Sequence, residues 1–329
     1  MLNVIGARDS KVMNKDIRDN IVIFSGGAHP SLADAVCREL GVDLSPSSRQ
    51  RFSNDCFGVR LNVNCREKDV FIIQPLTKPV QDHLVELLLM LDAARGASAS
   101  RITAVIPYYA YARSDKKDAP RISIAARLVA DLLVTAGANR VLTMTLHAPQ
   151  VHGFFSVPVD HLHALNILAR HFYGRDLRNT VVVSPDLGNA KSASEFARLL
   201  KTPVAAGRKQ RISDTEVIID TIVGDVRGKE VIILDDEISS GGTIIALLGL
   251  LRKFDVPRVS IVCTHGLFAG AHIQDICSNP EVREIVTTDT TPVANITHKS
   301  FHVASIAPLL AEAISRIHNG ESISSLFVP

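Results

Sequence analysis

The sequence predicts an α/β protein with two domains, each built on a parallel sheet flanked by helices. Short apolar runs of strand length alternate with longer segments that have the apolar spacing of helices, and this alternation is typical of parallel sheets. The chain has 329 residues, more than one hydrophobic core usually supports, so two domains are expected. The alternation begins again after about residue 160, near the middle of the chain.

Four strands are expected in the first half of the chain. Each is apolar at nearly every position, as in strands that are buried on both faces of a sheet. The strands are residues 21–24, 70–74, 102–106 and 140–145, and helices are expected at 31–40 and 82–94.

Polar segments after the third and fourth strands carry candidate binding residues. Residues 108–117 combine three tyrosines with Arg113, Lys116 and Lys117, so they suit either a nucleotide site or a solvated loop. His147 and His152 follow the fourth strand, where a histidine can be a metal ligand, a phosphate ligand or a structural residue. The residues alone leave these alternatives open.

The second half repeats the pattern with five expected strands and three helices. The strands are residues 179–184, 216–223, 231–234, 259–263 and 284–287, and the helices are 190–200, 244–253 and 306–317. Asp186 follows the first of these strands and could reach a ligand crevice through a magnesium ion. The basic segment 207–214 suits a solvated loop or a mobile loop beside a phosphate site.

The strand at 231–234 leads into the most informative segment of the chain. Asp235 and Asp236 follow it, and adjacent carboxylates repel one another, so a plain turn gains little from them. Small residues come next and enter a helix, whose first amides and dipole favour an anion: Ser239, Ser240, Gly241, Gly242 and Thr243. Carboxylates accept hydrogen bonds from sugar hydroxyls, so the segment suits a sugar phosphate, whereas the alternative is an unliganded capped helix.

Composition excludes several other classes of function. Hydrophobic residues make up 46% and charged residues 21% of the chain, and the net charge of +2 gives no sign of a nucleic-acid or membrane surface. The five cysteines are odd in number and form no Cys-x-x-Cys pair, so we expect reduced thiols and no zinc site. No apolar run is long enough for a membrane span or a signal peptide, and a cytoplasmic location is expected.

Seven motifs in order resemble those of the ribose-phosphate pyrophosphokinase family, also called phosphoribosyl-diphosphate synthetases, and the resemblance runs from about residue 22 to residue 327. The motifs are RFS at 51–53, PYYAYAR at 107–113, LHA at 146–148 with GFF at 153–155, SPD at 184–186, KQR at 209–211, DDEISSGGT at 235–243 and GESISSLF at 320–327. One such motif would be weak evidence, but seven in this order make the resemblance specific.

The resemblance implies both a fold and a reaction. The fold is two tandem type I phosphoribosyltransferase-like domains, at residues 1–166 and 167–309, with a terminal helix at about 310–329 that packs back on the first domain. The reaction transfers the diphosphoryl group of ATP to the 1-hydroxyl of ribose 5-phosphate, with Mg²⁺, and gives phosphoribosyl diphosphate and AMP. A homo-oligomer is also implied, commonly a hexamer built from dimers.

The resemblance further implies a role for each motif residue. Asp235 and Asp236 match residues that hold the ribose hydroxyls, and the loop 239–243 matches the 5-phosphate site. His147 and Asp186 match magnesium ligands, and Lys209 and Arg211 match the pair that stabilises the transferring group. The positions that match the ATP site are Phe52, Asn54, Arg113, Ser114 and His147.

Some residues depart from the family's pattern. Cys56 stands where an acid usually bonds adenine, Ser114 replaces a glutamine, Thr145 an aspartate, and Ser239 the loop's second acid. Two other functions therefore stay open: a phosphoribosyltransferase that consumes the diphosphate, and a weakly catalytic regulatory subunit of a synthetase.

Overall fold

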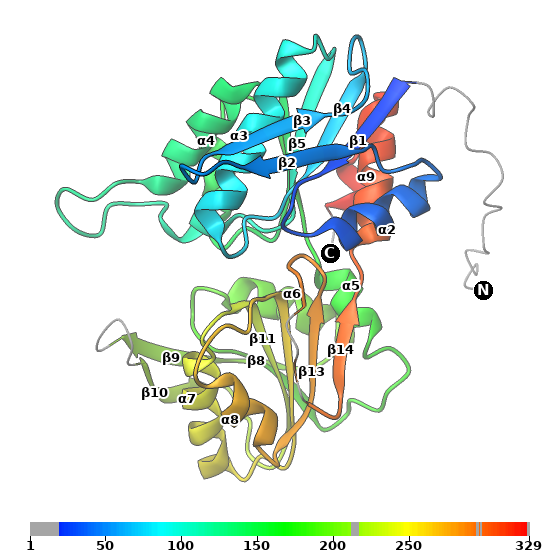
Figure 1. The fold of residues 1–329 in the computed structure, drawn as a ribbon. Helices are drawn as coiled ribbons and strands as arrows, with labels where there is room; N and C mark the ends of the chain where they lie inside the picture. The colour runs from blue at the N-terminus through cyan, green and yellow to red at the C-terminus, as the bar shows by residue number, and fades with distance from the viewer. Residues whose placement is uncertain (1–19, 212–216, 294–295, 297, 328–329) are drawn as a thin grey trace, which may run out of the picture.

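The computed structural model describes residues 20–211, 217–293, 296 and 298–327. Two α/β lobes lie one above the other, each with its own sheet (Figure 1). The α/β class and the parallel sheets flanked by helices, as predicted, are confirmed. None of the helices that the structure describes is long and apolar enough for a membrane span.

The first sheet is entirely parallel and has the order β1-β4-β5-β6-β7. Its strands are β1 (Ile21–Ser25), β4 (Asp69–Ile73), β5 (Arg101–Ile106), β6 (Arg140–Met144) and β7 (Val159–Leu162). Successive residues of β1 belong to different core clusters, one on each side of the sheet. Burial on both faces explains why these strands are continuous apolar runs.

Helices cover both faces of this sheet. One face packs against α3 (Val80–Gly96) and α4 (Ala125–Ala136). The other packs against α2 (Pro30–Leu40) and against α9 (Ala307–Asn319), which returns from the far end of the chain. Gly320 ends α9 in the left-handed conformation, and a short 3₁₀ turn, η4 (Ser324–Leu326), follows.

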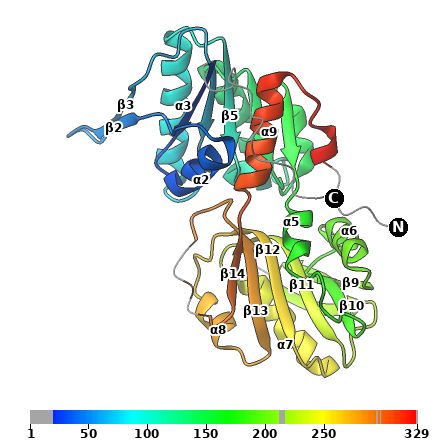
Figure 2. The ribbon, with the colours of Figure 1, turned by 90° about the vertical axis from the view of Figure 1, so that its right-hand side faces the viewer.

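An antiparallel hairpin of β2 (Ser47–Arg51) and β3 (Phe57–Leu61) lies outside this sheet. Its tip extends away from the first lobe (Figure 2). The sequence did not predict it, because every residue of β2 is exposed and the segment has no apolar alternation. Arg49 and Arg51 tie the hairpin to α3 through ion pairs with Glu86 and Asp82.

The second sheet has the order β10-β9-β8-β11-β12-β13-β14 and is parallel except for the pair β9 and β10. One face packs against α5 (Leu165–Arg170) and α6 (Ala190–Leu200), and the other against α7 (Gly242–Leu251) and α8 (Ile273–Ser278). A 3₁₀ turn, η3 (Arg252–Phe254), follows α7. The strands are β8 (Thr180–Ser184), β9 (Val204–Arg211), β10 (Val217–Val223), β11 (Glu230–Ile238), β12 (Val259–Gly266), β13 (Val282–Thr288) and β14 (Phe301–Ala304).

Two sequence predictions need correction. The strand at 231–234 does not end before the carboxylates, because β11 continues to Ile238 and its pairing with β12 runs from Val231 to Ile238, so Asp235 and Asp236 lie within the strand. The basic segment that begins at residue 207 is not a loop up to Arg211, because β9 pairs there with β10. In both cases backbone pairing with a neighbouring strand keeps polar residues extended.

A continuous core joins the two lobes. One buried cluster contains Ile23 of β1 and Leu310 of α9, from the first lobe, together with Val262 of β12, from the second. The segments around α5 and α9 run between the lobes in Figure 1. The domain boundaries at residues 166 and 309 stay a prediction.

A buried ion pair attaches α9 to the first sheet. The carboxylate of Asp69 is 6% exposed, pairs with Arg101 and accepts a hydrogen bond from Nδ1 of His318 at 2.9 Å. Burial acts to raise the pKa of Asp69, but the hydrogen bonds from His318 and Arg101 outweigh it, so the pKa is lowered. The charged carboxylate therefore stabilises the docked position of α9.

We expect Asp69→Asn to lower the free energy of unfolding by about 2 kcal/mol, because it leaves Arg101 half-buried without its anion. The lowered pKa means that this contribution is complete above the ordinary carboxyl pKa of 3.8 and is lost as the pH falls through the folded-state value. Denaturant unfolding at pH 7 and at pH 3 measures both effects. Asp92→Asn, which breaks an exposed pair with Arg95, is the control and should change little. Equal stability of both variants at pH 7 would contradict the assignment.

Candidate functional site

The candidate site lies where the carboxyl ends of strands from the two lobes meet. From the first lobe come the segments after β5 and β6, which continue into 3₁₀ turns, η1 (Ala110–Arg113) and η2 (Pro149–Phe154). From the second come the ends of β11 and β12. Because parallel strands place ligands beyond their carboxyl ends, a substrate at this junction would touch both lobes.

His147 and Asp236 form the central contact across the junction. Nδ1 of His147 donates to Oδ2 of Asp236 at 2.7 Å. This hydrogen bond raises the pKa of His147. Burial acts to raise the pKa of Asp236, but the hydrogen bond from His147 outweighs it and holds that pKa well below its usual range. The pair therefore favours a charged histidine beside a charged carboxylate.

A second carboxylate beside this pair has the opposite shift. Burial raises the pKa of Asp235 well above its ordinary value, and the negative charges of Asp236 and Asp186 add to the effect. The Asp186 carboxylate accepts a hydrogen bond from the backbone amide of Asn189 at 3.0 Å. The Asn189 side chain donates to the carbonyl of Leu234 at 3.1 Å, which fixes this turn against β11. Three acidic side chains thus gather at one end of the second sheet.

Glu237 forms the next link between the lobes. Its buried carboxylate accepts a hydrogen bond from the phenol of Tyr108 at 3.2 Å and pairs with Arg113 at 3.4 Å. Glu237 was not among the candidate site residues of the sequence analysis, although its position directly after Asp235 and Asp236 could have indicated that it lies at the site. Arg113, in contrast, was predicted, and the structure brings it to the same junction as His147.

The loop 239–243 runs from the end of β11 into the N-terminus of α7. Gly241 has φ 83°, a left-handed conformation that suits glycine, and a Cβ there would lie 2.8 Å from the Ile276 side chain. The loop is held by the following segment, where the amide of Ala269 donates to the carbonyl of Ser239 at 3.0 Å. A Cβ at Gly270 would lie 2.3 Å from the Cα of Ser240, so glycine permits this close approach. The first amides of α7 therefore lie beside the acidic cluster. An anion site needs such unpaired backbone amides at the N-terminus of a helix.

The other predicted residues lie outside the junction, or their side chains form hydrogen bonds with backbone groups. Phe52 and Asn54 lie in the turn between β2 and β3, where the Phe52 side chain is 46% exposed and Asn54 accepts a hydrogen bond from the amide of Cys56. Ser114 accepts a hydrogen bond from the amide of Ala125, at the start of α4, at 3.2 Å. His152 lies in η2 and contacts the carbonyl of Pro149. The structure therefore brings together His147 and Arg113 but leaves the hairpin tip on a separate projection.

Lys209 and Arg211 lie at the end of β9, opposite Ile219 and Val217 of β10. Their side chains and residues 212–216 lie outside the part of the chain that the structure describes. Their predicted role stays a prediction.

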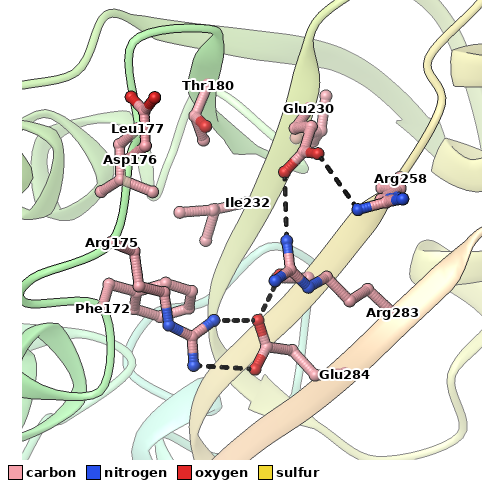
Figure 3. Close-up of a pocket in the computed structure, with 12 residues that line it drawn as sticks. Phe172, Arg175, Asp176, Leu177, Thr180, Glu230, Ile232, Arg258, Arg283 and Glu284 are labelled. Atoms are coloured by element: carbon pink, nitrogen blue, oxygen red, sulfur yellow. Dashed lines mark hydrogen bonds and ion pairs between the residues drawn. The ribbon is translucent and has the colours of Figure 1, made fainter.

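A cavity of about 240 Å³ lies at the other end of the second sheet, where β8, β11 and β13 begin (Figure 3). Three arginines line it, but each already pairs with a glutamate: Arg175 with Glu284, and Arg258 and Arg283 with Glu230. We therefore do not assign an anion to it.

Three side chains near this cavity lie close enough to share a metal ion. They are His171, Glu284 and His302, whose ligand atoms lie within 4.8 Å of one another. The guanidinium of Arg175 already lies 2.7 Å from Nε2 of His171 and 3.2 Å from Oε2 of Glu284. A cation is therefore present where the metal would bind, and the cluster is a poor metal site.

The chain matches two family models. Residues 21–137 match the N-terminal domain of ribose phosphate pyrophosphokinase, and residues 212–328 match the phosphoribosyl synthetase-associated domain. The two models together cover most of both lobes.

Full-length relatives agree with these models. A Streptomyces coelicolor protein provisionally named ribose-phosphate pyrophosphokinase is 61% identical over 94% of this chain and 98% of its own. The Deinococcus radiodurans ribose-phosphate pyrophosphokinase is 48% identical, with the same two coverages. The crystal structure of phosphoribosylpyrophosphate synthetase from Mycobacterium smegmatis has a TM-score of 0.85 at 39% identity, over 92% of this chain and 99% of that one.

We expect Asp236→Asn to lower the pKa of His147 toward its ordinary value of 6.5, because the amide removes the anion that stabilises the imidazolium. An NMR titration of the histidine ring protons measures this change. Asp235→Asn is the matched control and should change the pKa of His147 less, since Asp236 makes the hydrogen bond that is the main cause of its shift. An unchanged pKa in Asp236→Asn would show that the 2.7 Å contact is absent in solution.

Proposed function

Because the chain belongs to the ribose-phosphate pyrophosphokinase family and has that family's diphosphokinase activity, we propose that it transfers the diphosphoryl group of ATP to the 1-hydroxyl of ribose 5-phosphate. The products are phosphoribosyl diphosphate and AMP. One observation carries the proposal: His147, on the expected ATP side, lies 2.7 Å from Asp236, on the expected sugar side. The family assignment favours this synthesis over a phosphoribosyltransferase or a regulatory subunit.

In our proposal the second lobe binds the sugar. Asp235 and Asp236 hold the ribose hydroxyls, since a carboxylate can accept several hydrogen bonds. The 5-phosphate binds at the start of α7, where the loop hydroxyls and first amides of the helix supply donors. Those loop residues are Ser239, Ser240, Gly241, Gly242 and Thr243.

The first lobe binds ATP through residues that the junction leaves accessible. Arg113 and His147 are 48% and 43% exposed, so both cations can contact phosphates. Phe52, Asn54 and Ser114 complete the proposed ATP set. The hairpin that carries Phe52 projects from its own lobe (Figure 2), which supports a site completed by a neighbouring subunit in a dimer-based hexamer.

Mg²⁺ fits the donors near the junction. The raised pKa of Asp235 shows that burial and the charges of Asp236 and Asp186 disfavour its ionised form, and a divalent cation would relieve this repulsion. Asp186 offers the carboxylate oxygen that Mg²⁺ prefers. Asp236 engages Nδ1 of His147, so Nε2 is the atom that His147 would offer, and it could do so only after losing the proton that it carries in the charged ring. When bound, Mg²⁺ neutralises phosphate charge and orients the nucleotide.

The transfer needs positioned charges more than a covalent nucleophile. The 1-oxygen of the sugar forms a bond to the β-phosphorus, the bond from that phosphorus to the α,β-bridging oxygen breaks, and AMP leaves. Negative charge develops on the diphosphoryl oxygens, and we assign its stabilisation to Lys209 and Arg211. We also propose a cytoplasmic enzyme, to which the free thiols of its five cysteines are suited, with neither nucleic acid nor a membrane as a partner.

Purified protein should release AMP from ATP with magnesium only when ribose 5-phosphate is present. The reason is that the sugar supplies the attacking oxygen. In the proposed site, the acidic residues at the end of β11 hold that sugar. Chromatography of the nucleotides measures AMP, and phosphorus NMR identifies phosphoribosyl diphosphate. Absence of AMP with phosphate supplied and other nucleotides tried would refute the proposed activity, and AMP without the sugar would indicate hydrolysis.

We expect Lys209→Ala and Arg211→Ala each to lower turnover by roughly 100-fold or more, because each removes a cation from the transition state. The dissociation constant of ribose 5-phosphate should stay nearly unchanged. Arg208→Ala is the matched control, since Arg208 lies on the same strand and pairs with Asp220 at 2.6 Å. Steady-state kinetics and calorimetry make the distinction, and lost sugar binding at unchanged turnover would refute the role.

A further inference from the structure

The short segment that carries His147 has an unfavourable backbone. Thr145 has φ 42°, in the left-handed region that a residue with a branched Cβ rarely adopts. The segment is nevertheless fixed, since Thr145 donates its amide to the carbonyl of Leu162 at 2.8 Å. A strained backbone conformation persists only where surrounding contacts hold it in place. The contacts around Thr145 must therefore stabilise this conformation.

His265 of β12 holds this segment from the other lobe. Its ring is 3% exposed and lies 5.0 Å from the ring of Tyr108, between centroids. Nε2 lies 3.0 Å from the carbonyl oxygen of Thr145, and Nδ1 lies 2.9 Å from Oγ1 of Thr290. A carbonyl oxygen only accepts, so Nε2 carries the proton and donates to Thr145. Burial also lowers the pKa of His265, which favours the neutral ring.

A second imidazole holds the same segment from within its own lobe. The amide of Leu146 donates to Nε2 of His161 at 2.8 Å, so this nitrogen is the acceptor of the ring. Burial lowers the pKa of His161 to about 3, with smaller effects from His163 and other histidines, and the ring is neutral. Two neutral histidines thus bond the two polar groups of one peptide unit, the Thr145 carbonyl and the Leu146 amide, just before His147.

We propose that His265 is a positioning residue, which fixes His147 toward Asp236 by anchoring the Thr145 carbonyl to the second lobe. The inference rests on the proposed function, in which His147 contacts the ATP phosphates. The segment 145–147 is then tied to the sugar lobe at both ends, by His265 to β12 and by Asp236 to β11. Two bonds to neighbouring strands restrict rotation of the segment more than one bond can, and placement of catalytic groups is sensitive to such changes.

Two conservative variants separate positioning from packing. The amide nitrogen of glutamine can occupy the place of Nε2, so His265→Gln keeps the donor for Thr145. The asparagine side chain is shorter and reaches only the place of Nδ1, so His265→Asn keeps the Thr290 contact and loses the one across the junction. We expect turnover and binding of α,β-methylene ATP with magnesium to fall by roughly 10-fold or more in His265→Asn. Both should stay within about 3-fold of wild type in His265→Gln.

Steady-state kinetics, calorimetry with α,β-methylene ATP and thermal unfolding measure these effects on the full chain. Val259→Ala is the packing control, since Val259 is buried on the same strand but belongs to the core cluster that lies within the second lobe. It should lower the melting temperature and leave nucleotide binding unchanged. The inference is overturned if His265→Gln and His265→Asn behave alike, or if nucleotide binding falls only in step with melting temperature.

Wild-type protein and His147→Ala are measured beside these variants. An inactive wild type would reject the proposed function itself. An active wild type, with a weak His147→Ala variant and an unaffected His265→Asn variant, would reject only the positioning role.

Discussion

The site depends on one constraint: the carboxyl ends of two separate sheets must face one another at hydrogen-bonding distance. The core that joins the lobes provides this, because Ile23 and Leu310 of the first lobe belong to the same buried cluster as Val262 of the second. Neither lobe alone contains the contact between His147 and Asp236. The apolar packing is therefore the physical basis of the polar site, since it sets the distance at which the charged groups meet.

The sequence predicted most parts of the fold whose signal is local, although α4 was missed despite the helical spacing of its buried residues. Each apolar run proposed as a strand overlaps a strand of the structure, although Gln74, Thr145 and Asn179 lie one residue beyond the observed ends. The prediction succeeds because a strand that is buried on both faces is apolar at nearly every position. The hairpin of β2 and β3 was missed, because the residues of β2 are exposed and form no such apolar run. The end of β11 was also missed, since its pairing with β12 is a contact between segments that are distant in sequence. Exposed strands and long-range pairing are not encoded in a local pattern.

The candidate site divides in the same way. Asp235, Asp236 and the loop 239–243 were identified because their chemistry is contained in consecutive residues. Glu237 and His265 were not identified, because the partners of each side chain lie in the other lobe. Glu237 contacts Arg113 and Tyr108, and His265 contacts the Thr145 carbonyl. A buried glutamate or histidine has no sequence signature that distinguishes a link between domains from an ordinary satisfied core residue.

The charges at the junction explain why an acidic site can serve anionic substrates. Asp186, Asp235, Asp236 and Glu237 lie around it, and burial raises the pKa of Asp235 and of Glu237, so uncompensated negative charge is unfavourable here. Any ionised carboxylate would also repel a polyphosphate unless a cation compensated its charge. Arg113 and His147 supply compensation from the first lobe, and each is already directed by a carboxylate of the second. A cation held in this way keeps its remaining donors in fixed directions, which reduces the entropy lost when a phosphate binds. In the function that we propose, the carboxylates therefore serve the anion site indirectly, by orienting the cations that would contact it.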